Sequence, residues 1–160
     1  MTPQIDIGPL PDAVLRLELS TTRGAARLRD FLGHQWVIFF YPKDDTPGCT
    51  VEAKDFSAQH RNFLAADTQV IGVSRDHLAS HEKFIAKHGL SITLVSDLQE
   101  SVCQAFGVLK EKNLYGRKFI GIERSTFLID AKGAVRRVWR PVKVPGHVQE
   151  VLAAARQKAP

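Results

Sequence analysis

Cys49 occupies a position in the sequence at which a thiol becomes reactive. It follows the apolar run Trp36–Phe40, which is typical of a buried strand, and a loop that contains Pro42 and Pro47. After it, apolar residues recur at helical spacing, so the cysteine falls in the first turn of a predicted helix. That turn presents unpaired N–H groups and about half a positive charge, which favour a nucleophilic thiolate. On position alone, a buried and inert cysteine is the alternative.

The residues just before Cys49 favour reactivity. Thr46 lies three residues earlier, and a tight bend at Pro47 and Gly48 can hold its hydroxyl near the sulfur. Neither residue of the bend has a side chain that would block this approach, and Gly48 can adopt a left-handed conformation. A nearby arginine would stabilise the anion further.

The elements that must position Cys49 alternate between strands and helices. We expect strands over residues 14–20, 36–41, 69–73, 92–95, 125–129 and 135–139, and helices over residues 28–32, 50–64, 80–87, 100–106 and 146–158. Residues 36–41 are apolar without alternation, which suits a central strand covered on both faces. The turn residues 130–133 join the last two strands into a hairpin, with Gly133 able to take a positive φ.

The order of these elements predicts an α/β fold. Residues 1–12, with prolines at positions 3, 9 and 11, form an irregular N-terminal segment, and residues 89–121 form a surface excursion. When these two segments are left out, the remaining elements follow the thioredoxin order: strand, helix, strand, helix, strand, strand, helix. A central mixed sheet flanked by helices follows from it. We therefore expect one thioredoxin-like domain over residues 1–160, with an N-terminal extension and an insertion before the C-terminal hairpin.

The composition excludes several classes of function. The 160 residues are 44% hydrophobic and 24% charged, as in a soluble globular protein, and no apolar run approaches the ~20 residues of a membrane span. Residues 1–15 lack the pattern of a secretion signal, and two cysteines suit a reducing compartment, so we expect a cytoplasmic protein. The net charge is +5, and no run of five or six like charges occurs, which indicates a solvated basic face rather than a nucleic-acid interface.

Pro42, Thr46 and Cys49 match the peroxiredoxin motif of Pro, three residues, Thr or Ser, two residues, Cys. The string over residues 39–50 resembles the Q-type subfamily, also called bacterioferritin comigratory protein. Further similarity lies at Glu52, at the pair Tyr115-Gly116 and over residues 124–130 and 142–147. The resemblance runs from about Leu15 to Leu152. It implies a thioredoxin-like fold, a monomer, and a thiol-dependent peroxidase that reduces hydrogen peroxide and organic hydroperoxides.

The resemblance also implies roles for five residues. Cys49 would be the peroxidatic cysteine, and Thr46 would hydrogen-bond the sulfur and a peroxide oxygen. Arg124 would stabilise the thiolate and the charge that builds on the oxygens, with a solvated strand-end cation as the alternative. Pro42 would keep water from the reactive oxygen, and Glu52, one turn into the helix, would orient an arginine. Fixed donors suit this chemistry because charge moves from sulfur onto a departing oxygen.

Attack on a peroxide leaves a sulfenic acid, which needs a second thiol. Many Q-type members carry a resolving cysteine five residues after the first, but here that position is Lys54. Cys103 is the other candidate, with a small core residue as the alternative, and a disulfide needs Cα atoms within ~7 Å. We therefore expect a one-cysteine cycle in which thioredoxin, or glutathione with glutaredoxin, reduces Cys49. A two-cysteine cycle through Cys103 stays open.

No metal or cofactor is expected. His77 and His81 have the i, i+4 spacing of a helical metal site, but no third ligand accompanies them, so a solvated helix face is expected. Two other functions stay open. A thiol–disulfide oxidoreductase would need a Cys-x-x-Cys pair, and Glu52 stands in place of its second cysteine. A non-enzymatic, redox-regulated binding protein would leave peroxide levels unchanged.

Overall fold

The computed structural model describes residues 5–157, and the bounds of its elements follow. The strands are β1 (Gly8–Pro9), β2 (Glu18–Thr21), β3 (Gly24–Arg27), β4 (Gln35–Phe40), β5 (Thr68–Ser74), β6 (Thr93–Ser96), β7 (Leu109–Leu114), β8 (Arg117–Ile122), β9 (Ser125–Ile129) and β10 (Ala134–Trp139). The helices are α1 (Asp12–Leu15), the 3-10 helix η1 (Leu28–Phe31), α2 (Pro47–Ala58), α3 (His60–Ala65), α4 (Leu78–His88), α5 (Ser101–Ala105) and α6 (His147–Arg156). Within residues 5–157, no helix has the length and apolar character needed to cross a bilayer.

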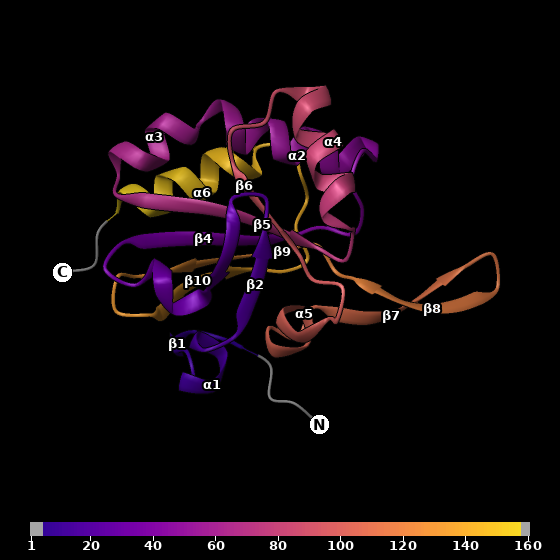
Figure 1. Ribbon diagram of the computed structural model, residues 1–160, viewed down its shortest axis with the longest axis horizontal. Helices are drawn as coiled ribbons and strands as arrows, with labels where there is room; N and C mark the ends of the chain where they lie inside the picture. Colours follow the sequence, from indigo (N-terminus) through magenta and orange to yellow (C-terminus); the bar gives the residue numbers. More distant parts are fainter. Residues whose placement is uncertain (1–4, 158–160) are drawn as a thin grey trace.

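A mixed sheet forms the centre of the structure, with the strand order β1-β10-β9-β4-β5-β6-β2-β3. The central strand β4 pairs with β5 in parallel and with β9 in antiparallel orientation. Helices α2, α3, α4 and α6 cover one face of this sheet, while α1 and α5 lie on the other (Figure 1). Strands β7 and β8 form a separate hairpin that projects from the body (Figure 1). The predicted thioredoxin-like order and mixed sheet are confirmed.

The two faces of the sheet carry two separate hydrophobic clusters. Alternate residues of β4 contribute to each: Trp36, Ile38 and Phe40 belong to the α5-side cluster, and Val37 and Phe39 belong to the α2-side cluster. All five side chains are fully buried. This burial on both faces explains why the strand is apolar without alternation.

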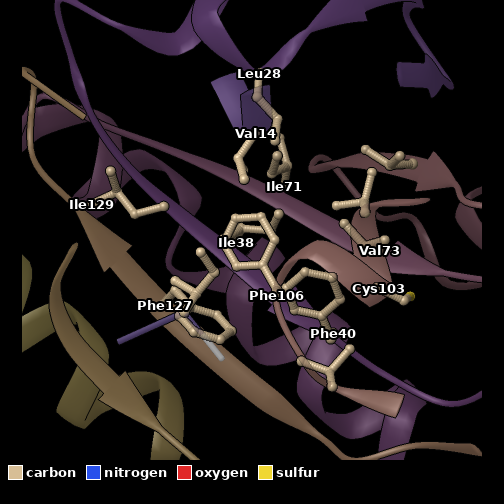
Figure 2. Close-up of a cluster of buried hydrophobic side chains, with 14 of the residues drawn as sticks. Val14, Leu28, Ile38, Phe40, Ile71, Val73, Cys103, Phe106, Phe127 and Ile129 are labelled. Carbon is tan, nitrogen blue, oxygen red and sulfur yellow. The ribbon is translucent and has the colours of Figure 1, made fainter. Parts of the chain in front are cut away.

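The two cysteines belong to different clusters. Cys49 packs in the α2-side cluster, whereas Cys103 packs in the α5-side cluster. Figure 2 shows Cys103 in that second cluster, whose labelled side chains include Phe40, Val73 and Phe106. Both thiols are free and buried. The sheet therefore separates them.

Three predicted elements differ from the structure. Residues 14–20 are not one strand, because Pro11 caps the short helix α1 before β2 begins at Glu18. The helix over residues 50–64 is divided at Gln59, and this bend brings the ring of Phe63 to 5.7 Å from that of Phe56. The excursion over residues 89–121 contains β6, which pairs with β5 and extends the central sheet. Pro3 and the predicted helix end at Lys158 lie outside the described residues.

Two glycines at the ends of elements have a positive φ, and one of them, Gly133, was predicted to take it. Gly89 ends α4 with φ of 63°, and Gly133 joins β9 to β10 with φ of 89°. A positive φ strains the backbone of any residue that has a Cβ. Glycine has none, so it adopts this conformation at either point without steric strain.

Candidate active site

The loop between β4 and α2 places Cys49 in the first turn of the helix. Thr46 is the N-cap residue, Pro47 is the first helical residue, and Cys49 is the third. Proline is favoured at the first helical position because its missing N–H has no partner there and its φ already suits a helix. The N–H of Cys49 likewise has no acceptor within the helix. Cys49 is only 1% exposed, so its thiol lies out of bulk water at the end of the helix that carries these donors.

The pairing of β4 with β9 brings Arg124 to the same point. Phe40 lies opposite Ser125 in the antiparallel register, so the residue before β9 lies beside the loop that leaves β4. The Nη2 atom of Arg124 donates to the Cys49 sulfur over 3.3 Å. Its Nη1 atom donates to Glu52 Oε1 over 2.8 Å. The guanidinium therefore bridges the carboxylate and the thiol.

Gly48 leaves room for this guanidinium. A Cβ at position 48 would lie 3.2 Å from Nη2 of Arg124, which is closer than side chains usually pack. Glycine at this position therefore lets the guanidinium approach the first turn of α2.

The charges of the site are coupled. Glu52 is fully buried, and within residues 5–157 its second oxygen, Oε2, has no hydrogen-bond partner. Burial raises the pKa of the Glu52 carboxyl to about 7, while the Arg124 guanidinium opposes that shift. Burial lowers the pKa of Arg124, but Glu52 and Cys49 outweigh this effect and raise it above its ordinary value. Arg124 therefore stays cationic beside the sulfur.

Thr46 and Pro42 lie in the segment between β4 and α2 that leads to Cys49. The hydroxyl of Thr46 donates to the carbonyl of Lys43 over 2.9 Å, and within the described residues it makes no hydrogen bond to Cys49. A hydroxyl has one proton, so it must rotate away from that carbonyl before it can donate to a thiolate or a peroxide. Pro42 follows β4 directly and is half-buried. Contacts of both residues with a peroxide remain predictions.

A buried polar network holds the loop in place, and the sequence did not reveal it. The Asp44 carboxylate accepts hydrogen bonds from Tyr41 (2.6 Å), Ser80 (2.8 Å) and His81 Nδ1 (2.7 Å). His81 Nε2 donates to the carbonyl of Val95 over 2.8 Å. Because a carbonyl can only accept, Nε2 carries a proton, and Nδ1 is directed at the Asp44 carboxyl group.

The expected solvated helix face is therefore wrong for His81, which is fully buried. It shares a face of α4 with Phe84 and Ile85, three and four residues later. That apolar spacing is the signal by which its burial could have been recognised. His77, at the N-cap of α4, is exposed as expected.

Asp44, Asp76 and His81 are also the residues whose geometry could hold a metal ion, with one ligand atom from each within 4.8 Å of the others. Both carboxyl oxygens of Asp44, both ring nitrogens of His81 and Oδ2 of Asp76 already have partners, however. Asp76 Oδ2 accepts from the Ser74 hydroxyl (2.5 Å) and from the Asp44 N–H (2.9 Å). These hydrogen bonds join the loop at Asp44 to Asp76 and to His81, and they hold the loop in place.

Comparison with known proteins identifies the family. The sequence pattern of the AhpC/TSA family matches residues 9–138. Peroxiredoxin Bcp of Xanthomonas campestris is 51% identical over 151 residues, which cover 94% of each chain. Peroxiredoxin Bcp of Bacillus subtilis is 47% identical over 137 residues, 85% of this chain and 87% of that protein.

A solved structure supports the same assignment. It is that of the Xanthomonas campestris bacterioferritin comigratory protein, studied for its alkyl peroxide reduction activity. It matches with a TM-score of 0.88 and 50% identity, and the match covers 94% of this chain and 97% of that one. The chain thus belongs to the AhpC/TSA family and, within it, to the Q-type peroxiredoxins, which are thiol-dependent peroxidases.

Proposed function

We propose that this chain reduces hydrogen peroxide and organic hydroperoxides in a one-cysteine cycle, with Cys49 as the peroxidatic cysteine. The observation that carries the proposal is the placement of the two thiols. Cys49 packs on the α2 side of the sheet and Cys103 on the α5 side, with the central strands between them. An external thiol must therefore restore oxidised Cys49.

In the first step, the Cys49 thiolate attacks one peroxide oxygen in line with the O–O bond. A sulfur–oxygen bond forms and the O–O bond breaks. The second oxygen leaves with the electron pair and takes a proton to become water or an alcohol. Negative charge moves away from sulfur along this path, so fixed donors beside it stabilise the transition state. Arg124, 3.3 Å from the sulfur, and the first-turn N–H groups of α2 are such donors.

Three neighbours support this step. Glu52 positions Arg124, because its bond to Nη1 leaves Nη2 directed at the sulfur. Thr46 is placed to turn its hydroxyl from the Lys43 carbonyl toward a bound peroxide oxygen. Pro42 covers the approach and limits the access of water to the sulfenic acid that forms.

Cys103 is a poor resolving thiol for two independent reasons. Burial, together with the nearby carboxylate of Asp97, raises the pKa of the Cys103 thiol far above its ordinary value, so the nucleophilic thiolate is scarce. Its Cα atom could reach that of Cys49 only if α2 or α5 left the sheet. A two-cysteine cycle through Cys103 would need that local unfolding.

The reductant is a thiol from outside the chain. Thioredoxin, or glutathione with glutaredoxin, supplies the required chemistry, and both operate in the reducing cytoplasm, where we place the protein. Two free cysteines agree with that compartment. We propose that the chain acts as a monomer, because the site is built from α2, the loop before it and the start of β9 of one chain.

The test compares wild type with Cys49→Ser and Cys103→Ser. Each protein is mixed with hydrogen peroxide, and peroxide loss and intact mass are followed with and without a thiol donor. We expect wild type and Cys103→Ser to gain one oxygen at Cys49 and to turn over when the donor is added. Cys49→Ser should leave the peroxide unchanged.

Two outcomes would contradict the proposal in different ways. Loss of turnover with every donor in Cys103→Ser, with the first oxidation intact, would establish the two-cysteine cycle instead. If reduced wild-type protein leaves the peroxide concentration unchanged, the chain is not a peroxidase, and the redox-regulated binding role becomes the better explanation.

A further inference from the structure

The hairpin of β7 and β8 projects from the body of the structure (Figure 1), and β8 ends at Ile122, two residues before Arg124. Its two strands pair in antiparallel register from Leu109 opposite Ile122 to Leu114 opposite Arg117. Tyr115 and Gly116 form the turn with φ of 53° and 78°, the two positive values of a type I′ turn. This turn suits the twist of a regular hairpin, so the projection is a built element rather than a loose loop.

The two faces of this hairpin differ in charge. Cross-strand partners share a face, and so do residues two apart along a strand. One face, called here the basic face, carries Lys110, Lys112, Leu114, Arg117 and Phe119. The other, called the neutral face, carries Glu111, Asn113, Lys118 and Ile120. The basic face therefore has three cations and no acid, while Lys118 pairs with Glu111 over 3.6 Å on the neutral face.

The basic face is continuous with the active site. The ammonium of Lys112 donates to the carbonyl of Ile122 over 2.6 Å, two residues before Arg124. Its stem passes over Gly121, where an added Cβ would lie 3.0 Å from Lys112 Cδ. Burial, followed by the nearby charge of Arg124, lowers the pKa of Lys112, while the more weakly coupled Cys49 raises it. Lys112 thus joins the basic face to the end of β8, two residues before Arg124.

The basic face also exposes large apolar side chains. Leu114 is 57% exposed and Phe119 is 45% exposed, while Ile120 on the neutral face is 53% exposed. Apolar side chains flanked by cations, on a rigid projection, are typical of a surface that a protein partner covers. The six-residue strands extend the surface over about 20 Å, far more than a small thiol would need.

We propose that the basic face of the hairpin docks the protein dithiol that reduces Cys49, and that this partner presents acidic side chains around an apolar patch beside its thiols. The inference rests on the proposed one-cysteine cycle. Positive charge on this face attracts and orients an acidic partner, and Phe119 and Leu114 supply the apolar contact.

Docking would serve two chemical steps. In the first, a thiolate of the partner attacks the sulfenic sulfur of Cys49, the sulfur–oxygen bond breaks, and hydroxide leaves and takes a proton to become water. In the second, the other thiolate of the partner attacks the partner sulfur that is bonded to Cys49. A disulfide forms within the partner, and Cys49 leaves as a thiolate. The first partner thiol must therefore reach the Cys49 sulfur, and the second must reach the partner sulfur bonded to it, which requires a partner held in one orientation.

The test uses two matched pairs of variants. Arg117→Glu and Phe119→Ser alter the basic face, while Lys118→Glu and Ile120→Ser make the same kinds of change on the neutral face. Steady-state peroxide reduction is measured with thioredoxin, with glutaredoxin and with dithiothreitol. We expect the basic-face variants to lower kcat/KM for the faster protein donor about tenfold, and the neutral-face variants to change it less than about twofold. Added salt should narrow the gap between Arg117→Glu and wild type.

The dithiothreitol arm separates the two proposals. Equal rates of all variants with dithiothreitol, together with the loss for the basic-face pair with the protein donor, support the docking surface. The docking surface is overturned if kcat/KM for the protein donor falls equally in both pairs of variants, or falls in neither pair. It is also overturned if neither protein donor outpaces dithiothreitol at equal thiol concentration. Failure of wild type with every donor would instead contradict the proposed function itself.

Discussion

At the scale of single residues, the chemistry depends on one cation with two tasks. Arg124 contacts both the Cys49 sulfur and the buried carboxylate of Glu52. Because Glu52 is buried with one oxygen lacking a partner, the arginine gives it most of its stabilisation. The same contact fixes the guanidinium in the orientation that the sulfur requires.

Removing this cation should slow the first oxidation step. We expect Arg124→Gln to lower the second-order rate constant for the reaction of Cys49 with hydrogen peroxide by roughly 100- to 1,000-fold, the usual cost of losing one donor to a developing anion. Stopped-flow single-turnover measurements report this rate constant. Arg137→Gln, which removes an exposed arginine stacked on Trp139, serves as the matched control and should retain the wild-type rate. A decrease below tenfold for Arg124→Gln would argue against its role.

His147 makes stability depend on pH. Burial lowers its pKa to about 4, an effect that Glu150 opposes and Arg124 reinforces, and its Nε2 lies 2.8 Å from Thr126 Oγ1. Between pH ~6.5 and pH ~4 the unfolded chain therefore takes up a proton that the folded chain does not. The free energy of unfolding should fall as the pH falls through this window, by about 2 kcal/mol.

Urea unfolding at pH 7 and pH 4.5 measures this effect. His147→Gln keeps a hydrogen-bonding side chain but does not titrate. The stability of wild type relative to this variant should decrease by about 2 kcal/mol at the lower pH. A relative stability that stays constant between the two pH values would show that His147 does not titrate differently in the two states.

At the scale of elements, α4 holds the active-site loop through two pairs of side chains. Asp44 pairs with His81 in the interior, and Asp45 pairs with His88 and Lys87 at the surface. Asp45 has φ of 59°, a left-handed conformation for a residue other than glycine, at the point where the loop turns toward Thr46. The loop is therefore held by its contacts with α4 as well as by its own sequence.

These two pairs should contribute very differently. His81→Leu leaves the buried Asp44 carboxyl group without its buried imidazole partner, and we expect a loss of about 3–5 kcal/mol in the free energy of unfolding. His88→Gln removes a partner from the exposed Asp45 carboxylate and should cost at most about 1 kcal/mol. Denaturant titration of both variants checks the comparison. Equal losses would mean that the interior pair is not ionised.

At the scale of the whole molecule, the sheet keeps the two thiols apart. Cys49 lies among the side chains under α2, and Cys103 lies in the cluster under α5 (Figure 2). A disulfide between them requires the loss of native packing on one face. The same separation leaves the recycling of Cys49 to a partner, for which the projecting hairpin offers a surface.

Unfolding should therefore control disulfide formation. We expect native protein treated with one equivalent of hydrogen peroxide to gain oxygen without forming a Cys49–Cys103 disulfide. The same treatment in strong denaturant should give a mass lower by two hydrogens, because the chain can then close the loop. Intact mass spectrometry without reductant distinguishes the products. A native disulfide at high yield would reveal an opening of α2 or α5 and favour the two-cysteine cycle.

Local sequence was sufficient for the reactive position. An apolar strand and a helix start depend on neighbouring residues, so the place of Cys49 in the first turn of α2 followed from the sequence. The helix begins at Pro47, however, and not at residue 50, so the bend predicted at Pro47 and Gly48 is the start of the helix. The bounds of β9 and the thioredoxin-like order followed from patterning and turns in the same way. The prediction failed at residues 14–20, where alternating leucines suggested one strand and Pro11 starts a helix instead.

Contacts between distant segments were decided only by the tertiary structure. Family resemblance named Arg124, but the register that sets Phe40 opposite Ser125 is what brings its guanidinium to the sulfur. The burial of His81 against Asp44 and the placement of Cys103 on the opposite face depend in the same way on how helices pack on the sheet. The sequence by itself determined where a thiol would be activated, because helix starts are local. The fold decided which charged side chain contacts that thiol, and it placed the second thiol out of reach on the other face of the sheet. Strand pairing and helix packing decide both, because they join residues that lie far apart in the sequence.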